Sequence, residues 1–219
     1  MKWPKDIARA KKVQEVLKKK VRITSLRKSL EYVAGVDAAF FGDKIVGVAC
    51  LYKYPEIIFV EEAYSITETS FPYIPGFLSF REGQAIIQAI YALKMKPHVI
   101  LFDGQGIAHP KGFGIAAHIG VLLDIPTIGC AKSRLVGNYR EPGFKKGNRS
   151  SLIYNGKIVG AVLRTRDNVR PVFVSPGHRT DLKNSIKVVL CCTNTYRIPE
   201  PLRSADFISK KIKRELLAG

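Results

Sequence analysis

Two aspartates lie in apolar segments, where an ionised side chain is unexpected. Asp37 interrupts VAGVDAAF, and Asp103 ends VILFD directly before a glycine-rich GQG. A buried, unpaired carboxylate is costly, so either a cation neutralises these side chains, or backbone N–H groups and a salt bridge satisfy them. Carboxylate ligands beside a phosphate substrate suit Mg²⁺ or Mn²⁺. A pair of such ions can activate a water molecule and stabilise the leaving oxygen of a phosphodiester.

Two further carboxylates are ambiguous on their own. Glu82 follows Ser79 at the spacing of a capping box, so it is either a helix-start residue or a third member of the acidic site. Asp206 lies near the start of the last predicted helix, where a solvated first-turn acid is the ordinary alternative to a ligand.

The charge balance indicates a polyanionic partner. The chain has 36 Lys and Arg against 18 Asp and Glu, a formal net charge of +18, and a pI near 9.9. Basic residues gather in residues 1–22 and 132–149. A lysine-rich surface of a heat-adapted protein would also be rich in Glu, which this chain is not. Nucleic acid is therefore the better interpretation.

Several other classes are excluded. No apolar run approaches the roughly 18 residues that a membrane span needs, and the first residues, MKWPKDIARAKK, are charged where a secretory signal is apolar. The four cysteines show no CxxC spacing and indicate reduced thiols, no structural zinc and a cytoplasmic location. No Ser–His–Asp triad or nucleotide-binding P-loop is present in the sequence.

The periodicity predicts one α/β domain over residues 1–219, with a mixed central sheet flanked by helices. A basic amphipathic helix (5–20) precedes an antiparallel meander, and strand–helix–strand units and a hairpin with Asn155-Gly156 at its turn follow. The predicted strands are 31–40, 44–54, 56–65, 98–103, 125–133, 151–165 (as the hairpin) and 171–177, and the later helices are 79–96, 115–124, 180–192 and 204–218.

The segment FPYIPGFLSFREG (71–83) is stiff at its start. Tyr73 lies between two prolines, each of which fixes its own φ and keeps the preceding residue extended. On this segment alone, the ring either packs into the core or projects as a rigid probe toward something outside the protein.

Six blocks follow one another along the chain: VAGVDAAF, FPYIPGFLSFREG, LFDGQGIAHPKGFGIAAHIG, PTIGCAKSRL, VSPGHRTD and RIPEPLRSAD. In this order they resemble the endonuclease V family of deoxyinosine 3′ endonucleases, over nearly the whole chain. The resemblance implies a ribonuclease H-like fold. It also implies Mg²⁺-dependent hydrolysis of the second phosphodiester bond 3′ to a deaminated adenine, with the lesion left in the nicked strand.

By motif, the resemblance implies metal binding by Asp37 and Asp103, joined by Glu82 from FREG as the catalytic glutamate. Asp206, next to the RIPEP block, would help to hold a second ion. Lys132 in CAKSRL would be a catalytic lysine close to the charge that develops on the phosphate.

The same resemblance implies the DNA contacts. Tyr73 resembles a wedge that enters the duplex where the altered base leaves the stack, and its neighbours Pro72, Ile74 and Pro75 are expected to contact the DNA with it. The substrate and lesion-pocket contacts implied by the family are Gly76, Leu78, Gly104 and His109. His178 either orders its own loop or contacts a phosphate.

The expected partner is therefore double- or single-stranded DNA that contains deoxyinosine, and the expected protein is a monomer. Two other functions stay open. An endoribonuclease specific for inosine could use the same scaffold, because the fold does not choose the sugar. A noncatalytic nucleic-acid binder would keep the basic surface alone, although the acids at positions 37, 82, 103 and 206 argue against it.

Overall fold

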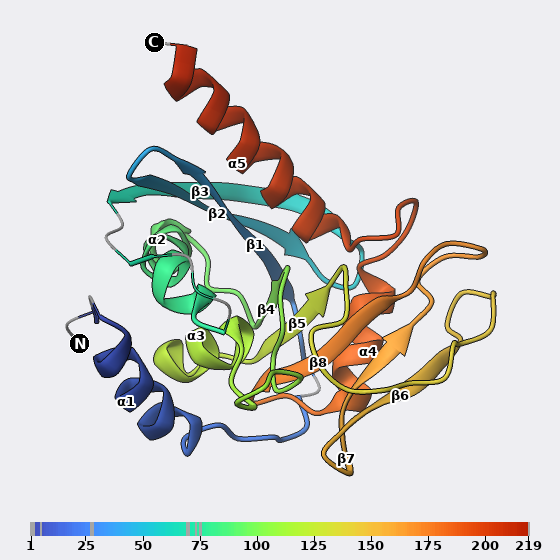
Figure 1. Ribbon diagram of the computed structural model, residues 1–219. Helices are drawn as coiled ribbons and strands as arrows, with labels where there is room; N and C mark the ends of the chain where they lie inside the picture. Colours follow the sequence, from blue (N-terminus) through green and yellow to red (C-terminus); the bar gives the residue numbers. More distant parts are fainter. Residues whose placement is uncertain are drawn as a thin grey trace.

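The computed structural model describes residues 3–4, 6–26, 29–68, 71–72, 74 and 76–218. Within them, eight strands form one sheet in the order β3-β2-β1-β4-β5-β8-β7-β6; four of the five helices pack on its two faces, and α1 packs on α3 (Figure 1). The strands are β1 (Tyr32–Phe41), β2 (Lys44–Lys53), β3 (Ile58–Glu68), β4 (Val99–Phe102), β5 (Thr127–Ala131), β6 (Arg149–Tyr154), β7 (Lys157–Leu163) and β8 (Val172–His178). The helices are α1 (Ile7–Lys18), α2 (Leu78–Ala92), α3 (Ile115–Leu123), α4 (Leu182–Cys191) and α5 (Glu200–Ala218).

The sheet is mixed, which confirms the predicted fold class. β1, β2 and β3 form an antiparallel meander, and β4 and β5 run parallel to β1. β8 pairs antiparallel to β5 and carries the β6–β7 hairpin. The hairpin turns at Asn155 and Gly156, whose φ values of 49° and 72° are both positive, as the predicted tight turn requires.

Each face of the sheet has its own core. On one face, α2 and α3 pack through Ile86, Ala89 and Ile119 against alternate residues of β1, β2 and β4. On the other face, α4 and α5 cover the remaining residues, with Val189 and Leu202 fully enclosed. None of the helices in the described part of the chain is both long and apolar enough to cross a membrane.

The predicted capping box at Ser79 is wrong. α2 begins at Leu78, and its N-cap residue, Phe77, makes no side-chain cap bond. Ser79 lies inside the helix, where it is buried and its hydroxyl is 2.8 Å from Nδ1 of His118. The Ser79 hydroxyl therefore bonds to His118 and does not cap the helix. Glu82 then has no capping role.

The last helix also begins earlier than the sequence suggests. α5 starts at Glu200, the acid of its first turn, and not at residue 204. Asp206 therefore lies in the second turn, and the interpretation of Asp206 as a first-turn acid is wrong.

Helices approach the meander closely because two strand residues have no side chain. A Cβ atom added to Gly35 of β1 would lie 2.2 Å from the carbonyl carbon of Pro201 at the start of α5. A Cβ atom on Gly47 of β2 would lie 2.4 Å from the carbonyl carbon of Ala85 in α2. At both positions the backbone of the helix lies directly against the backbone of the strand. The distance of α5 from β1 is therefore fixed at Gly35.

We expect Gly35→Ala to lower the free energy of unfolding by about 1–3 kcal/mol, because the methyl group can be accommodated only if α5 moves away from β1. Urea denaturation measures the change. The matched control is Gly42→Asn in the β1–β2 turn, where φ is 57° and an added Cβ meets nothing within 4 Å. Equal stability of Gly35→Ala and wild type would show that the contact is not tight in solution.

Candidate active site

The site lies where β4 ends and its neighbour β1 continues. The last residue pair between these parallel strands is Val36 with Phe102. Asp37 and Asp103 are the next residues on the two strands, and Lys132 directly follows β5. The carboxyl ends of parallel strands form the usual ligand edge of such a sheet. Strand alternation points Asp37, Asp103 and Lys132 toward the face that α5 covers, since Leu101 and Cys130 belong to that core.

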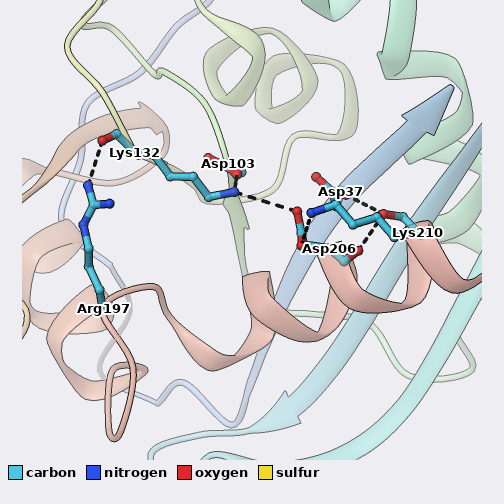
Figure 2. Close-up of polar contacts among 7 residues, drawn as sticks. Asp37, Asp103, Lys132, Arg197, Asp206 and Lys210 are labelled. Carbon is cyan, nitrogen blue, oxygen red and sulfur yellow. Dashed lines mark hydrogen bonds and ion pairs between the residues drawn. The ribbon is translucent and has the colours of Figure 1, made fainter.

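Lys132 joins the carboxylates across this gap. Its Nζ atom lies 2.5 Å from Oδ2 of Asp103 and 3.8 Å from Oδ1 of Asp206 on α5. Nζ of Lys210, one turn along α5, lies 2.7 Å from Oδ2 of Asp206. Figure 2 shows these side chains converging from β1, α5 and the loops after β4 and β5. Asp103, Lys132 and Asp206 are therefore brought together from three elements far apart in sequence.

Asp37 is held from α5. The hydroxyl of Ser209, which is fully buried, donates to Oδ2 of Asp37 over 2.6 Å and lies 3.0 Å from the carbonyl oxygen of Asp206. Burial, together with the nearby charges of Asp206 and Asp103, raises the pKa of Asp37 to about 6 against the lowering effect of the hydrogen bond from Ser209. Ser209 links the strand carboxylate to the helix that carries Asp206.

Glu82 approaches from the opposite face of the sheet, on α2. Burial, together with the charges of Asp37 and Asp103, raises the pKa of Glu82 to about 8, while Arg81 opposes the shift. Four carboxylates therefore share one region, in which Asp103 and Asp206 disfavour the ionised form of Asp37, and Asp37 and Asp103 disfavour that of Glu82.

The donor set fits hard divalent cations. In the described part of the chain, no three His, Cys, Asp or Glu side chains are already arranged as a set of metal ligands. The ammonium group of Lys132 instead lies between Asp103 and Asp206, where it stands in for a cation. Clustered carboxylates supply the oxygen donors that Mg²⁺ or Mn²⁺ prefers, and a bound cation would favour their ionised forms.

Two residues that sequence reasoning missed fix the backbone that carries Lys132. Nη2 of Arg197 donates to the carbonyl oxygens of Lys132 and Pro171, over 2.7 Å and 2.8 Å. The side-chain amide of Gln105 donates to the carbonyl of Ser133 over 3.2 Å. Both lie in blocks noted above, RIPEP and DGQG, and the signal was a polar side chain of unassigned role in each.

A separate hollow of about 400 Å³ opens beside Asp103 and Lys132. Gln105 and Ile115 contribute to its lining. The lining also includes all four residues that were predicted as lesion-pocket or substrate contacts, Gly76, Leu78, Gly104 and His109. Burial, helped by Lys18, lowers the pKa of His109 to about 4, so its ring is neutral at neutral pH. Its Nδ1 accepts from the N–H of Lys111, which places the proton on Nε2.

The remaining residues predicted to contact DNA lie in different environments. Pro72 is exposed, and Ile74 packs near Phe71 and Phe80. Tyr73 and Pro75 lie outside the described residues, so the wedge prediction is untested. His178 is buried at the other end of the sheet, where Nε2 lies 3.1 Å from Asp124 and Nδ1 accepts from the N–H of Arg22. These bonds favour loop order over a phosphate contact for His178.

Comparison with known proteins identifies relatives over nearly the whole chain. The family model described as Endonuclease V matches residues 15–207. Endonuclease V from Dictyoglomus turgidum is 49% identical over 208 residues, which cover 95% of this chain and 91% of that protein. The enzyme from Geotalea uraniireducens is 50% identical over 214 residues and covers 98% and 92%.

Solved structures agree. Endonuclease V from Streptomyces avermitilis has a TM-score of 0.94 at 39% identity, over 98% of this chain and 96% of that one. Endonuclease V of Ciona intestinalis was solved in complex with DNA containing an inosine followed by a ribo-adenosine. It has a TM-score of 0.83 at 32% identity, over 95% and 98% of the two chains.

We expect the stability of the protein in a chelator to fall as the pH rises from about 5 to 8. Glu82 has a raised pKa of about 8 in the folded protein, so folding retains a proton that the unfolded chain has already released. Glu82→Gln should flatten this slope, as measured by urea denaturation at a series of pH values. Glu68→Gln, at an exposed residue of β3, is the control. An unchanged slope in Glu82→Gln would contradict the electrostatic account.

Proposed function

Because this chain belongs to the endonuclease V family, we propose that Asp37, Glu82, Asp103 and Asp206 hold divalent ions for phosphodiester hydrolysis. The chain is a deoxyinosine 3′ endonuclease, which cleaves the second phosphodiester bond 3′ to the deaminated base and leaves that base in the nicked strand. The observation that carries the residue assignment is the convergence of Asp103 and Asp206 on one ammonium group, with Asp37 held to the same helix by Ser209.

Endonuclease V enzymes generally use a divalent metal. We propose Mg²⁺, with Mn²⁺ as a substitute, because all four donors are hard carboxylate oxygens. Bound there, such ions would activate a water molecule and stabilise the leaving 3′ oxygen.

The protein's own contribution is orientation and charge. Ser209 holds Asp37 toward α5, and Arg197 fixes the backbone of Lys132. The ammonium group of Lys132 is thereby kept at the edge of the carboxylate cluster, where the scissile phosphate must lie. Its positive charge stabilises the negative charge that develops on the non-bridging oxygens.

We propose that the hollow beside Asp103 receives the deaminated base after it leaves the stack. Hypoxanthine offers a carbonyl acceptor at O6 and a donor at N1–H. The neutral ring of His109 supplies an Nε2–H donor, and the backbone around Gly76 and Gly104 is open to close approach. DNA that contains deoxyinosine is the substrate that this combination supports.

The wedge role of Tyr73 rests on the sequence. We expect Tyr73→Ala to weaken binding to inosine-containing duplex by about 1–3 kcal/mol, which is the contribution of one base-stacking contact. Fluorescence anisotropy with a labelled duplex measures the change, and Tyr73→Phe should bind as wild type does. Identical affinities for wild type and Tyr73→Ala would remove the wedge.

We expect Asp103→Asn to slow the nicking of an inosine duplex by at least about 100-fold, because partners one step removed from a metal are already worth 10–100-fold. DNA binding should persist, since the contacts of the basic surface remain. Denaturing gels with and without Mg²⁺ give the rates, and Asp43→Asn, in the exposed β1–β2 turn, is the matched control. Full activity of Asp103→Asn would refute the proposed site.

A further inference from the structure

A groove of about 1370 Å³ runs between α5 and the edge strand β3. Its β3 wall presents Phe59, Tyr64 and Ile66, which are 48%, 56% and 41% exposed, and α5 adds Phe207 at 63%. We call it the α5–β3 groove.

The groove exists because α5 covers only part of its face of the sheet. α5 packs on β1 and β2, whereas β3 is covered only from the other side, by α2. Tyr64 and Ile66 pair with Val48 and Val46, whose side chains lie in the core beneath α5. The β3 residues thus point to the side of α5 without being covered by it. The C-terminal turns of α5 project beyond the strands (Figure 1).

The charge of the groove selects a polyanion. The basic residues of its lining outnumber its three acids, Glu62, Asp206 and Glu215. Asp206 is already paired with Lys210, and Lys211 lies 3.9 Å from Glu215. The basic residues are Lys132, Arg203, Lys210, Lys211, Lys213 and Arg214.

Exposed aromatic rings beside lysine and arginine suit one kind of polyanion. Unpaired bases stack on such rings while the cations follow the phosphates. Bases within a duplex are already stacked and cannot use these rings in the same way. The α5–β3 groove therefore matches a single strand and not a double helix.

The groove is continuous with the proposed active site. Lys132 lines both the groove and the base-binding hollow, and Asp206 lies in the groove wall. A strand whose altered base occupies the hollow passes the carboxylates before it reaches the groove. Because the enzyme cuts 3′ to that base, the segment beyond the cut is the 3′ segment.

We propose that the α5–β3 groove binds the unpaired strand 3′ to the cut, with Tyr64 and Phe207 as stacking platforms and Lys211 and Arg214 as phosphate contacts. The inference rests on the proposed function, because the hollow and the cleavage position set the direction of the strand. It makes the enzyme sensitive to the pairing state of the 3′ flank.

Binding of labelled deoxyinosine strands in chelator tests the proposal. One strand continues about ten nucleotides beyond the cut, within the range that single-strand sites occupy, and the other ends at the cut. Wild type should bind the longer strand at least about 5-fold more tightly, the lower limit for one stacked base. Annealing a complement to the 3′ flank should remove much of this gain.

The double variant Tyr64→Ala/Phe207→Ala should lose most of the preference for the longer strand and keep the part that the phosphate contacts of Lys211 and Arg214 supply. Both side chains are more than half exposed, so little loss of stability is expected. Tyr91→Ala is the matched control, because Tyr91 is a 71% exposed aromatic on α2, away from the groove. It should keep the wild-type preference for the longer strand.

Salt titration tests the cations independently. Each single-strand phosphate contact contributes about 0.7 to the slope of log affinity against log salt. Lys211→Ala/Arg214→Ala should reduce this slope for the longer strand but not for the shorter one. Lys157→Ala, in the β6–β7 hairpin, should change neither.

Three results would overturn the groove assignment: no preference for the longer strand in wild type, an undiminished preference in the Tyr64→Ala/Phe207→Ala variant, or a dimer of wild type that this variant dissociates. The last result would show that the groove is the interface between two copies of the chain. Inosine-dependent nicking by wild type in Mg²⁺ reports separately on the proposed function, so the two failures are distinguishable.

Discussion

The early end of β4 is the constraint on which the site depends. β1 continues to Phe41, but its β4 neighbour stops opposite Val36. Asp37 therefore pairs with β2, through Val48, but lies beyond the last residue pair with β4. Glu82 and Asp206 come from α2 and α5, which pack on opposite faces of the sheet. The hollow beside Asp103 and the α5–β3 groove share Lys132 in their linings.

The distribution of charge follows from this geometry. A protein with a net charge of +18 places several of its few acids at one point, and this point would repel a phosphate. Screening confines that repulsion to about 8 Å at physiological ionic strength, whereas a net charge of +18 favours the approach of a polyanion to the molecule as a whole. Lys132 and Lys210 neutralise part of the cluster at short range. The attraction of a polyanion to the molecule and the repulsion of phosphate at the carboxylates thus act over different distances.

The sequence predicted most elements because their signals are local. The strands of the meander, the buried β4 and β5, and the Asn155-Gly156 turn depend on alternation, apolar runs and positive φ, which neighbouring residues determine. The same reasoning failed at Ser79, since its partner His118 is 39 residues away. It also missed Arg197, whose contact with Lys132 spans 65 residues. Such contacts depend on how elements meet, and no local pattern records them.

Two other features could not be predicted from the sequence for the same reason. The α5–β3 groove could not be predicted because alternation on β3 is the same whether a helix covers the outer residues or leaves them open. Ser209 looked like an ordinary helical serine, and only the approach of α5 to β1 turns its hydroxyl toward Asp37. Asp37 and Asp103 stood out from their apolar neighbours and Glu82 and Asp206 from their motifs, whereas the residues that orient these acids had no such signal.

The contact at Gly35 has a consequence for the evolution of the enzyme. The helix that carries Asp206 and Ser209 rests on strand backbone, so no side chain is available there whose size selection could adjust gradually. The width of the active site is therefore inherited as a property of the main chain. Lineages can diversify the outer surface of α5, where Phe207 and Lys211 lie exposed, without altering the spacing of the acids. Substrate preference can drift while the chemistry stays constant.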